Sequence, residues 1–265
     1  MNIKKKILVI CLIVIIVIGL FALFRLKERK YKERADVKIP ILLYHNFLTT
    51  IPENDPDNFN YINTPESFEE NIKTLLEKGY TFISMKELAD ADSGKIDIPA
   101  KPIIITFDDG YYSNYEYIYL ILKKYNVKAS IFIITDRVGQ EIDGIKYLGW
   151  NECLEMQNSS LVEIFSHSKK HVFYDKRPVR EIRDDVKESY ELIEKNLGKQ
   201  DLKVFAYPYG AYTKETVLVL KNNGIDFQIY DLGINNFKNL DRNYIKRINI
   251  PCDMTGEEIV AELEH

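Results

Sequence analysis

The sequence predicts an α/β protein in which parallel strands alternate with helices and close into a single (β/α) barrel. Short apolar runs such as 103–107 are rich in β-branched residues, which is typical of parallel strands buried on both faces. Charged amphipathic segments such as 178–197 separate these runs. With 265 residues the chain can bury one large core, and alternation at this spacing favours a barrel.

An unbroken apolar run precedes the barrel. It covers residues 7–24, which is long enough for a membrane-spanning helix and too long for a typical signal-peptide core. No small-x-small cleavage site follows it. We therefore predict a short basic N-terminus (1–6), one uncleaved transmembrane helix (7–24), a juxtamembrane stalk (25–38) and a folded domain (39–265).

The elements of the barrel begin at residue 39. The first strand, 39–45, ends on His45, and a polar loop with several Asn and Pro residues follows it. Thr64 and Pro65 occupy the N-cap and first-turn positions of a helix. Apolar side chains spaced three and four residues apart give this helix one buried face, and it ends at Gly79.

Strands and helices then alternate to the C-terminus. Each further strand is a short run dominated by apolar residues, expected at 80–83, 103–108, 129–134, 161–165, 203–206, 227–230 and 245–250. Each further helix carries apolar residues along one side, expected at 85–91, 114–125, 150–157, 178–197, 214–222 and 256–264. No internal repeat or low-complexity tract interrupts the pattern.

The charge of the chain argues against a nucleic acid partner, and its cysteine content argues against a disulfide scaffold. Without residues 1–34 the chain keeps 27 Lys and Arg against 38 Asp and Glu, a formal charge of −11. Such an acidic domain repels polyanions, so we expect no nucleic acid partner. Cys153 and Cys252 lie far apart in the chain and are interpreted as free thiols, not as a disulfide scaffold.

The segment Thr106-Phe107-Asp108-Asp109-Gly110 places two adjacent carboxylates at the end of a buried strand. Burying both charges is costly unless something neutralises them. A metal ion can take one carboxylate as a ligand and leave the other free as a base. The alternative interpretation is a simple turn, because Asp-Gly is a common turn dipeptide.

Two of the four histidines, His167 and His171, lie four residues apart just after a predicted strand. At this spacing two imidazoles can reach one ion; the alternative is a pair of solvated loop histidines. With Asp109 they form a two-His, one-carboxylate set with open coordination positions. That set suits a catalytic divalent metal, Zn²⁺ first, with Co²⁺, Ni²⁺ or Fe²⁺ as alternatives.

A third segment, Tyr207-Pro208-Tyr209-Gly210, also follows a predicted strand. Pro and Gly fix a rigid turn, which can direct backbone N–H groups at a developing oxyanion, although most such turns do nothing else. Four loops, beginning at His45, Asp108, His167 and Pro208, thus fall at the carboxyl ends of predicted strands. Barrels carry their active sites on that face.

These three segments resemble the motifs of the polysaccharide deacetylase family, also called the NodB-homology family or carbohydrate esterase family 4. Thr106–Gly110, His167–His171 and Tyr207–Gly210 match its first, second and third motifs, and the resemblance extends from about residue 39 to the C-terminus. The resemblance implies a distorted (β/α) barrel of the NodB type and a hydrolase of carbon–nitrogen bonds other than peptide bonds. It also implies roles for individual residues, namely metal ligands (Asp109, His167, His171), general base (Asp108) and an oxyanion turn (Pro208, Tyr209, Gly210) in which the Tyr209 N–H is the donor.

The chain departs from the family pattern in two places. The third motif often begins with Arg, where this chain has Ala206, and no Leu-x-His follows late in the chain to supply the usual general acid. Tyr44-His45 is similar to the first strand of the poly-β-1,6-N-acetylglucosamine deacetylases, in which a histidine here acts as the acid and Ala replaces the Arg. We therefore predict His45 as the general acid; the alternative is a buried histidine bonded to the backbone.

The resemblance implies a metal-dependent N-deacetylase acting on N-acetylglucosamine units of a cell-surface polysaccharide, and the polymer we expect is poly-β-1,6-N-acetylglucosamine, a biofilm adhesin. The alternatives are a peptidoglycan N-acetylglucosamine deacetylase, an O-acetyl esterase, a membrane-tethered carbohydrate-binding domain without turnover and a cytoplasmic hydrolase of small N-acetyl substrates. Polysaccharide synthesis or export machinery is the expected protein partner.

The charges beside the apolar run conflict with this substrate. Three Lys and Arg residues precede the run and six follow it, so the positive-inside rule alone would place the domain in the cytoplasm. A cell-surface substrate requires the opposite orientation. We give the substrate more weight and predict a single-pass protein of the cell membrane with an extracellular catalytic domain.

Overall fold

The computed structural model describes residue 19 and residues 37–51 and 61–264. A closed barrel of seven parallel strands lies at its centre, which confirms the predicted (β/α) barrel. The strand order is β2–β14–β12–β11–β10–β7–β6, and β2 pairs with β6 to close the ring. The strands are β2 (Ile41–Tyr44), β6 (Pro102–Phe107), β7 (Ala129–Ile133), β10 (Val162–Ser166), β11 (Val204–Ala206), β12 (Phe227–Leu232) and β14 (Ile245–Asn249).

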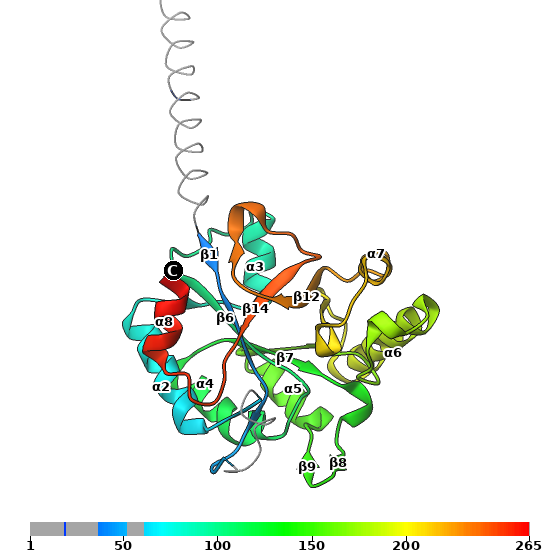
Figure 1. Cartoon of the computed structure of the whole chain (residues 1–265), viewed down its shortest axis with the longest axis horizontal. Coiled ribbons are helices and arrows are strands. Elements are labelled where there is room, and N and C mark those ends of the chain that lie inside the picture. The colour runs from blue at the N-terminus through cyan, green and yellow to red at the C-terminus, as the bar shows by residue number, and fades with distance from the viewer. Residues whose placement is uncertain (1–18, 20–36, 52–60, 265) are drawn as a thin grey trace, which may run out of the picture.

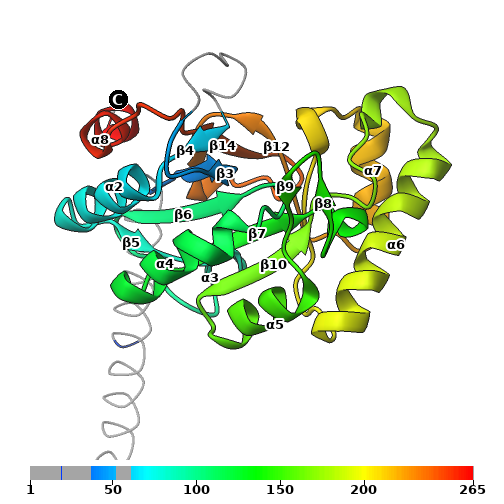
Figure 2. The ribbon, with the colours of Figure 1, turned by 90° about the horizontal axis from the view of Figure 1, so that it is seen from below.

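Helices surround the strands, as Figures 1 and 2 show. The N-cap predicted at Thr64 is present, because its hydroxyl accepts the Ser67 N–H at 3.1 Å. The C-terminal helix α8 lies beside α2, far from it in sequence (Figure 1). The helices are α2 (Pro65–Glu77), α3 (Met85–Asp92), α4 (Tyr119–Tyr125), α5 (Trp150–Asn158), α6 (Val179–Leu197), α7 (Lys214–Asn222) and α8 (Gly256–Glu264).

Short elements outside the barrel were mostly not predicted. The helix expected at 114–125 begins as a π-helix, η1 (Asn114–Ile118), before α4. A hairpin formed by β8 and β9 projects from the barrel (Figures 1 and 2). The short strands are β1 (Lys38–Ile39) paired with β13 (Asn235–Asn236), β3 (Asn46–Phe47) with β4 (Ile62–Asn63), β8 (Glu141–Ile142) with β9 (Ile145–Lys146), and β5 (Thr81–Phe82) with the start of β6.

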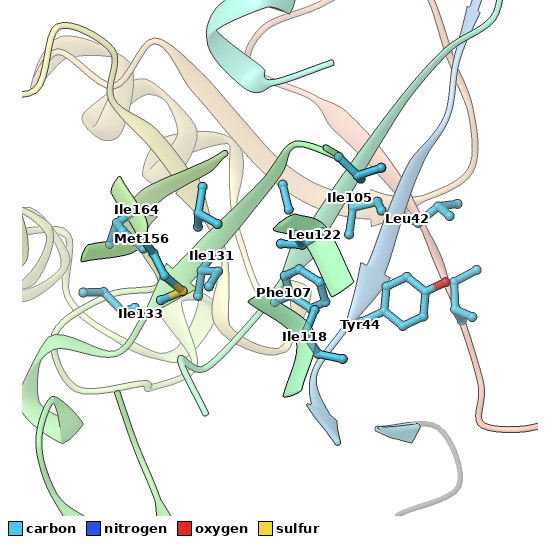
Figure 3. Close-up of a cluster of buried hydrophobic side chains, with 14 of the residues drawn as sticks. Leu42, Tyr44, Ile105, Phe107, Ile118, Leu122, Ile131, Ile133, Met156 and Ile164 are labelled. Atoms are coloured by element: carbon cyan, nitrogen blue, oxygen red, sulfur yellow. The ribbon is translucent and has the colours of Figure 1, made fainter. Parts of the chain in front are cut away.

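Alternation along the strands divides the core into two layers. Phe107 and Ile131 pack outward against Ile118 and Leu122 of the helices, in the cluster that Figure 3 shows. The other strand face forms a second cluster inside the barrel, which α3 also joins. Ile104 belongs to that inner cluster. The same alternation therefore directs the side chains of Thr106 and Asp108 toward the barrel interior.

The predicted membrane location is corrected. In the part of the chain that the structure describes, no helix is both long enough and apolar enough to cross a bilayer. The predicted helix at 7–24, except for residue 19, and the stalk at 25–38, except for its last two residues, lie outside the described residues. The single-pass, extracellular location is therefore withdrawn, and the domain boundaries stay a prediction. Cys153 and Cys252 are free thiols, as expected.

Candidate active site

The predicted site residues meet at the carboxyl ends of the barrel strands. A cavity of about 680 Å³ opens there. Seven of the eight predicted residues line it, namely His45, Asp108, Asp109, His167, His171, Tyr209 and Gly210. The eighth, Pro208, is buried and does not line the cavity. The structure therefore brings together residues from four strand ends that are distant in sequence.

Backbone strain concentrates in the three motif loops. Among the described residues, seven that are not glycine have positive φ, and four of these lie in the motifs: Asp109, Ser168, His171 and Tyr209. Residues held in this region cost of order 1–3 kcal/mol each and persist where the surroundings fix them, often at functional sites. Gly110 is required for a further reason, because a Cβ there would lie 2.9 Å from Ile133 Cγ2.

Asp109, His167 and His171 form a group that fits a metal ion. Their potential ligand atoms all lie within 4.8 Å of one another. Oδ1 of Asp109 is 3.7 Å from His167 Nε2 and 3.2 Å from His171 Nε2. Ligands about 2.1 Å from a tetrahedral ion lie roughly 3.4 Å apart, so little movement is needed. Asp109 Oδ1 is buried and has no hydrogen-bond partner among the described residues, as expected of an atom that binds an ion.

The two imidazoles are held in different ways. Nδ1 of His167 lies 2.9 Å from the carbonyl oxygen of Ala206 and can donate to it, which leaves the Nε2 lone pair free for a metal. The loop of His171 is held by its backbone, since its N–H donates to Ser168 Oγ at 2.8 Å. Burial lowers the pKa of His171 to about 4, so at neutral pH its imidazole is in the neutral form that binds metals.

Asp108 lies beside the metal group and pairs with Arg247. The guanidinium donates to both carboxylate oxygens, with both N···O distances 2.7 Å. Both side chains are buried, and such bidentate pairs fix the carboxylate plane. Burial alone would raise the pKa of Asp108, but Arg247, with weaker contributions from His167 and His45, holds that pKa well below its ordinary value. Asp108 is therefore ionised at neutral pH.

Arg247 is the main site residue outside the predicted set. The sequence allows two interpretations of it, a side chain that steers the base or an ordinary surface or structural charge; we favoured the second, and the contact with Asp108 supports the first. A usable signal was present, because Arg247 lies two residues after Ile245 in a predicted strand and so shares its inward face. A charged residue at an inward strand position near the carboxyl end indicates that a side chain of opposite charge lies beside it in the barrel. The cation that pairs with Asp108 thus comes from β14.

His45 follows β2 and lines the same cavity. The ring of Tyr61 lies edge-on to it, with the ring centroids 4.9 Å apart. Nδ1 of His45 is buried and has no hydrogen-bond partner among the described residues, so the alternative of a histidine bonded to the backbone through that atom is not what is observed. Burial lowers the pKa of His45, while the carboxylates of Asp108 and Asp109 oppose that shift.

The third motif lines the same cavity through Tyr209 and Gly210. Tyr209 has φ 60° and ψ 11° within the short turn η4 (Pro208–Gly210). Gly210 has φ +62°, and a Cβ there would lie 2.8 Å from the carbonyl oxygen of Tyr230. The turn is therefore tightly packed against β12. Three tyrosines outside the motifs also line the cavity, Tyr61, Tyr111 and Tyr230, together with Tyr207 of the third motif.

A parallel barrel whose strand ends gather a carboxylate and two imidazoles has the architecture of a metal-dependent hydrolase. The sequence profile of the family described as polysaccharide deacetylase matches residues 95–228. The chain belongs to this family, which is also carbohydrate esterase family 4, and is a hydrolase of carbon–nitrogen bonds other than peptide bonds. This confirms the family predicted from the three motifs.

Similar proteins extend the match beyond the profile. The chain is 30% identical over 249 residues to the poly-β-1,6-N-acetyl-D-glucosamine N-deacetylase of Staphylococcus aureus, covering 86% of this chain and 82% of that one. The solved structure of the Streptococcus pyogenes deacetylase PplD in complex with acetate is 26% identical, with a TM-score of 0.77, covering 87% of this chain and 100% of that one. IcaB from Ammonifex degensii shares the fold, with 24% identity, a TM-score of 0.76 and coverage of 88% and 99%.

The family is metal-dependent, and the Asp–His–His group is a candidate site for its ion. The structure itself gives the distances and the unpartnered ligand atom that support this assignment.

Proposed function

We propose that this chain removes acetyl groups from N-acetylglucosamine units of a cell-surface polysaccharide, poly-β-1,6-N-acetylglucosamine. The observation that carries the proposal is the Asp109–His167–His171 group placed beside Asp108 in one cavity. The aromatic lining of that cavity suits a sugar, whose apolar ring faces pack on tyrosines. The Staphylococcus aureus relative, named for this polymer, supports the choice of linkage.

We infer that Asp109, His167 and His171 hold Zn²⁺. Two imidazoles and one carboxylate leave a coordination position open, as catalytic zinc sites do. When bound, the ion polarises a carbonyl oxygen and lowers the pKa of water to about 7. The chain's own part is to present the two Nε2 lone pairs and the free Asp109 oxygen toward one point.

Asp108 is the proposed general base. Its carboxylate is next to the ligand Asp109 in sequence, and Arg247 fixes its plane through two hydrogen bonds. A fixed, ionised carboxylate can accept the proton of the attacking water without first losing one of its own. The proton is then held at an oxygen of Asp108 while the water oxygen bonds to the acetyl carbon.

His45 and the third motif complete the proposed reaction. His45, in its protonated form, donates a proton to the leaving nitrogen as the carbon–nitrogen bond breaks. The Tyr209 N–H, in the rigid turn between Pro208 and Gly210, donates to the oxyanion that forms on the acetyl oxygen. The products are acetate and an amine on the sugar.

Acetate release from defined oligomers tests the proposal. β-1,6-linked N-acetylglucosamine oligomers should release acetate, β-1,4-linked oligomers much less, and a chelator should abolish release until Zn²⁺ is restored. Asp108→Asn should keep its metal and lose turnover by roughly 10²–10⁴-fold. Preference for the β-1,4 oligomers would favour the peptidoglycan alternative, and full activity in the chelated protein would contradict the metal assignment.

A further inference from the structure

The side chain of His171 lacks the hydrogen bond that orients most metal-binding histidines. Such residues usually donate their second ring N–H to a carbonyl or carboxylate, as His167 can to Ala206. In contrast, Nδ1 of His171 is buried and has no partner among the described residues. Something else must fix the rotation of this ring, because its Nε2 faces Asp109 at 3.2 Å.

An aromatic stack contacts the His171 ring. The centroid of the Tyr209 ring lies 4.6 Å from that of His171, and the two ring planes are inclined at 49°. Tyr209 in turn lies parallel to Phe173, with centroids 3.9 Å apart and an interplanar angle of 8°. Phe173 is two residues after His171, so the stack joins the second motif to the third. Offset or parallel aromatic pairs attract one another beyond the effect of their burial.

This stack is exposed, with Phe173 41% and Tyr209 58% accessible, which could also indicate a surface for sugar stacking. The two faces of the Phe173 ring argue against a sugar surface at that residue. Tyr209 covers one face of Phe173, and Nζ of Lys176, 4.4 Å from the Phe173 centroid, therefore covers the other. A sugar ring needs an open aromatic face, and Phe173 offers none.

The segment that carries Phe173 is held in place by buried side chains. Phe173 directly precedes η3 (Tyr174–Lys176), and Tyr174 is fully buried. The Tyr174 hydroxyl donates to Asp185 at 2.7 Å, and the same carboxylate oxygen accepts the Lys169 N–H at 2.8 Å. One helix side chain therefore holds both sides of the loop that carries His171, and Phe173 leaves this loop in a fixed direction.

We propose that Phe173 and Tyr209 are a positioning pair, which fixes the His171 imidazole for metal binding by ring packing where a hydrogen bond would normally do so. The inference rests on the proposed metal site and deepens it. Phe173 does not touch the reacting atoms; it acts through Tyr209 and His171. Both His171 and Tyr209 hold left-handed backbone conformations, at φ +54° and +60°, which require such support.

Zn²⁺ affinity of variants in the full chain tests the proposal. Competition with a chelating indicator should show Phe173→Ala binding Zn²⁺ roughly 10-fold more weakly or worse, as for other residues that orient metal ligands. Phe173→Leu keeps apolar volume without a flat ring and should weaken binding similarly, which preserves the test if the Ala variant fails to fold. Phe173→Tyr can stack and should bind like the wild type.

Controls separate positioning from a general loss of stability. Leu218→Ala removes a similarly exposed apolar side chain on α7 and should leave Zn²⁺ affinity unchanged. The absorption bands of bound Co²⁺ should change in Phe173→Leu and not in Phe173→Tyr, because they report ligand geometry.

The outcomes distinguish this inference from the proposed function. Wild-type Zn²⁺ affinity in Phe173→Ala and Phe173→Leu overturns the inference. If those variants instead show only a higher KM for β-1,6-linked oligomers, the pair is a sugar surface and the inference is equally wrong. If the wild-type chain itself binds no Zn²⁺, the proposed metal site is at fault.

Discussion

Two carboxylates at opposite ends of the barrel differ in their hydrogen-bond partners. Glu163, near the amino end of β10, accepts three hydrogen bonds, from the N–H groups of Met85 and Lys86 and from the Ser130 hydroxyl. Asp109, at the carboxyl end of β6, keeps one buried oxygen without any partner among the described residues. The carboxylate of Glu163 therefore has hydrogen-bond partners on both oxygens, whereas Asp109 keeps an oxygen that can bind an ion.

The difference shows how a barrel separates stability from chemistry. Glu163 lies at the first turn of α3, where unpaired N–H groups and the helix dipole favour a negative charge, so it joins a helix to the sheet. Asp109 sits in a left-handed conformation among strained loops. Free energy gained at one end of the barrel can sustain an unsatisfied, strained group at the other. Substitutions at each end should therefore have different consequences.

Asp109→Ala should have the largest effect. It removes a proposed metal ligand, so bound Zn²⁺ and activity should be lost together, with turnover down by roughly 10³-fold or more, because a metal supplies several kcal/mol of transition-state stabilisation. Metal analysis beside acetate release measures both, with Glu163→Gln as the control that keeps its metal. Full metal content in Asp109→Ala would contradict the ligand assignment.

Arg247→Met should have the next largest effect. It leaves the Asp108 carboxylate buried without its cation, which typically costs about 3–5 kcal/mol of unfolding free energy. Urea unfolding of the metal-free protein measures this cost. The double variant Arg247→Met with Asp108→Asn should recover part of the loss, because no uncompensated charge then remains. A single variant as stable as the wild type would show that the pair contributes little.

His45→Ala should lower turnover by roughly 10²-fold while metal content stays unchanged, as for loss of a general acid. Acetate release and metal analysis on the same sample check both. Wild-type turnover would assign the acid role to another group. Tyr61→Phe is a matched control, since it preserves the ring that packs on His45.

Glu163→Gln should have the smallest effect, a loss of about 1–3 kcal/mol in unfolding free energy without loss of metal, because an amide cannot accept all three hydrogen bonds. Burial raises the pKa of Glu163 in the folded protein. Glu163 therefore holds its proton more tightly in the folded protein than in the unfolded chain. The stabilisation that this gives is fully present below the pKa of Glu163 in the unfolded chain, and it is lost as the pH rises through the pKa of Glu163 in the folded protein. Unfolding curves should therefore show a wider gap between wild type and variant at pH 4.5 than at pH 7.

The motifs could be located from the sequence because each ends a predicted strand. Alternating apolar runs and Thr64 gave the order of strands and helices, and parallel strands must place their carboxyl ends on one side. Arg247 was left out of the predicted site because its partner Asp108 lies 139 residues away, and pairing at that distance depends on which strands become neighbours. The side-by-side placement of Phe173 and Tyr209 was hidden for the same reason.

The order in which the ring closes has a consequence for synthesis. β2, the first strand of the ring, is flanked by β6 and by β14, which is the last strand of the ring in sequence. Until β14 leaves the ribosome, β2 and β12 expose open edges that can pair with other chains. Arg247 arrives with that same strand. The nascent chain thus carries Asp108 uncompensated until β14 emerges, so the ring closes in the same step in which the proposed base gains its cation.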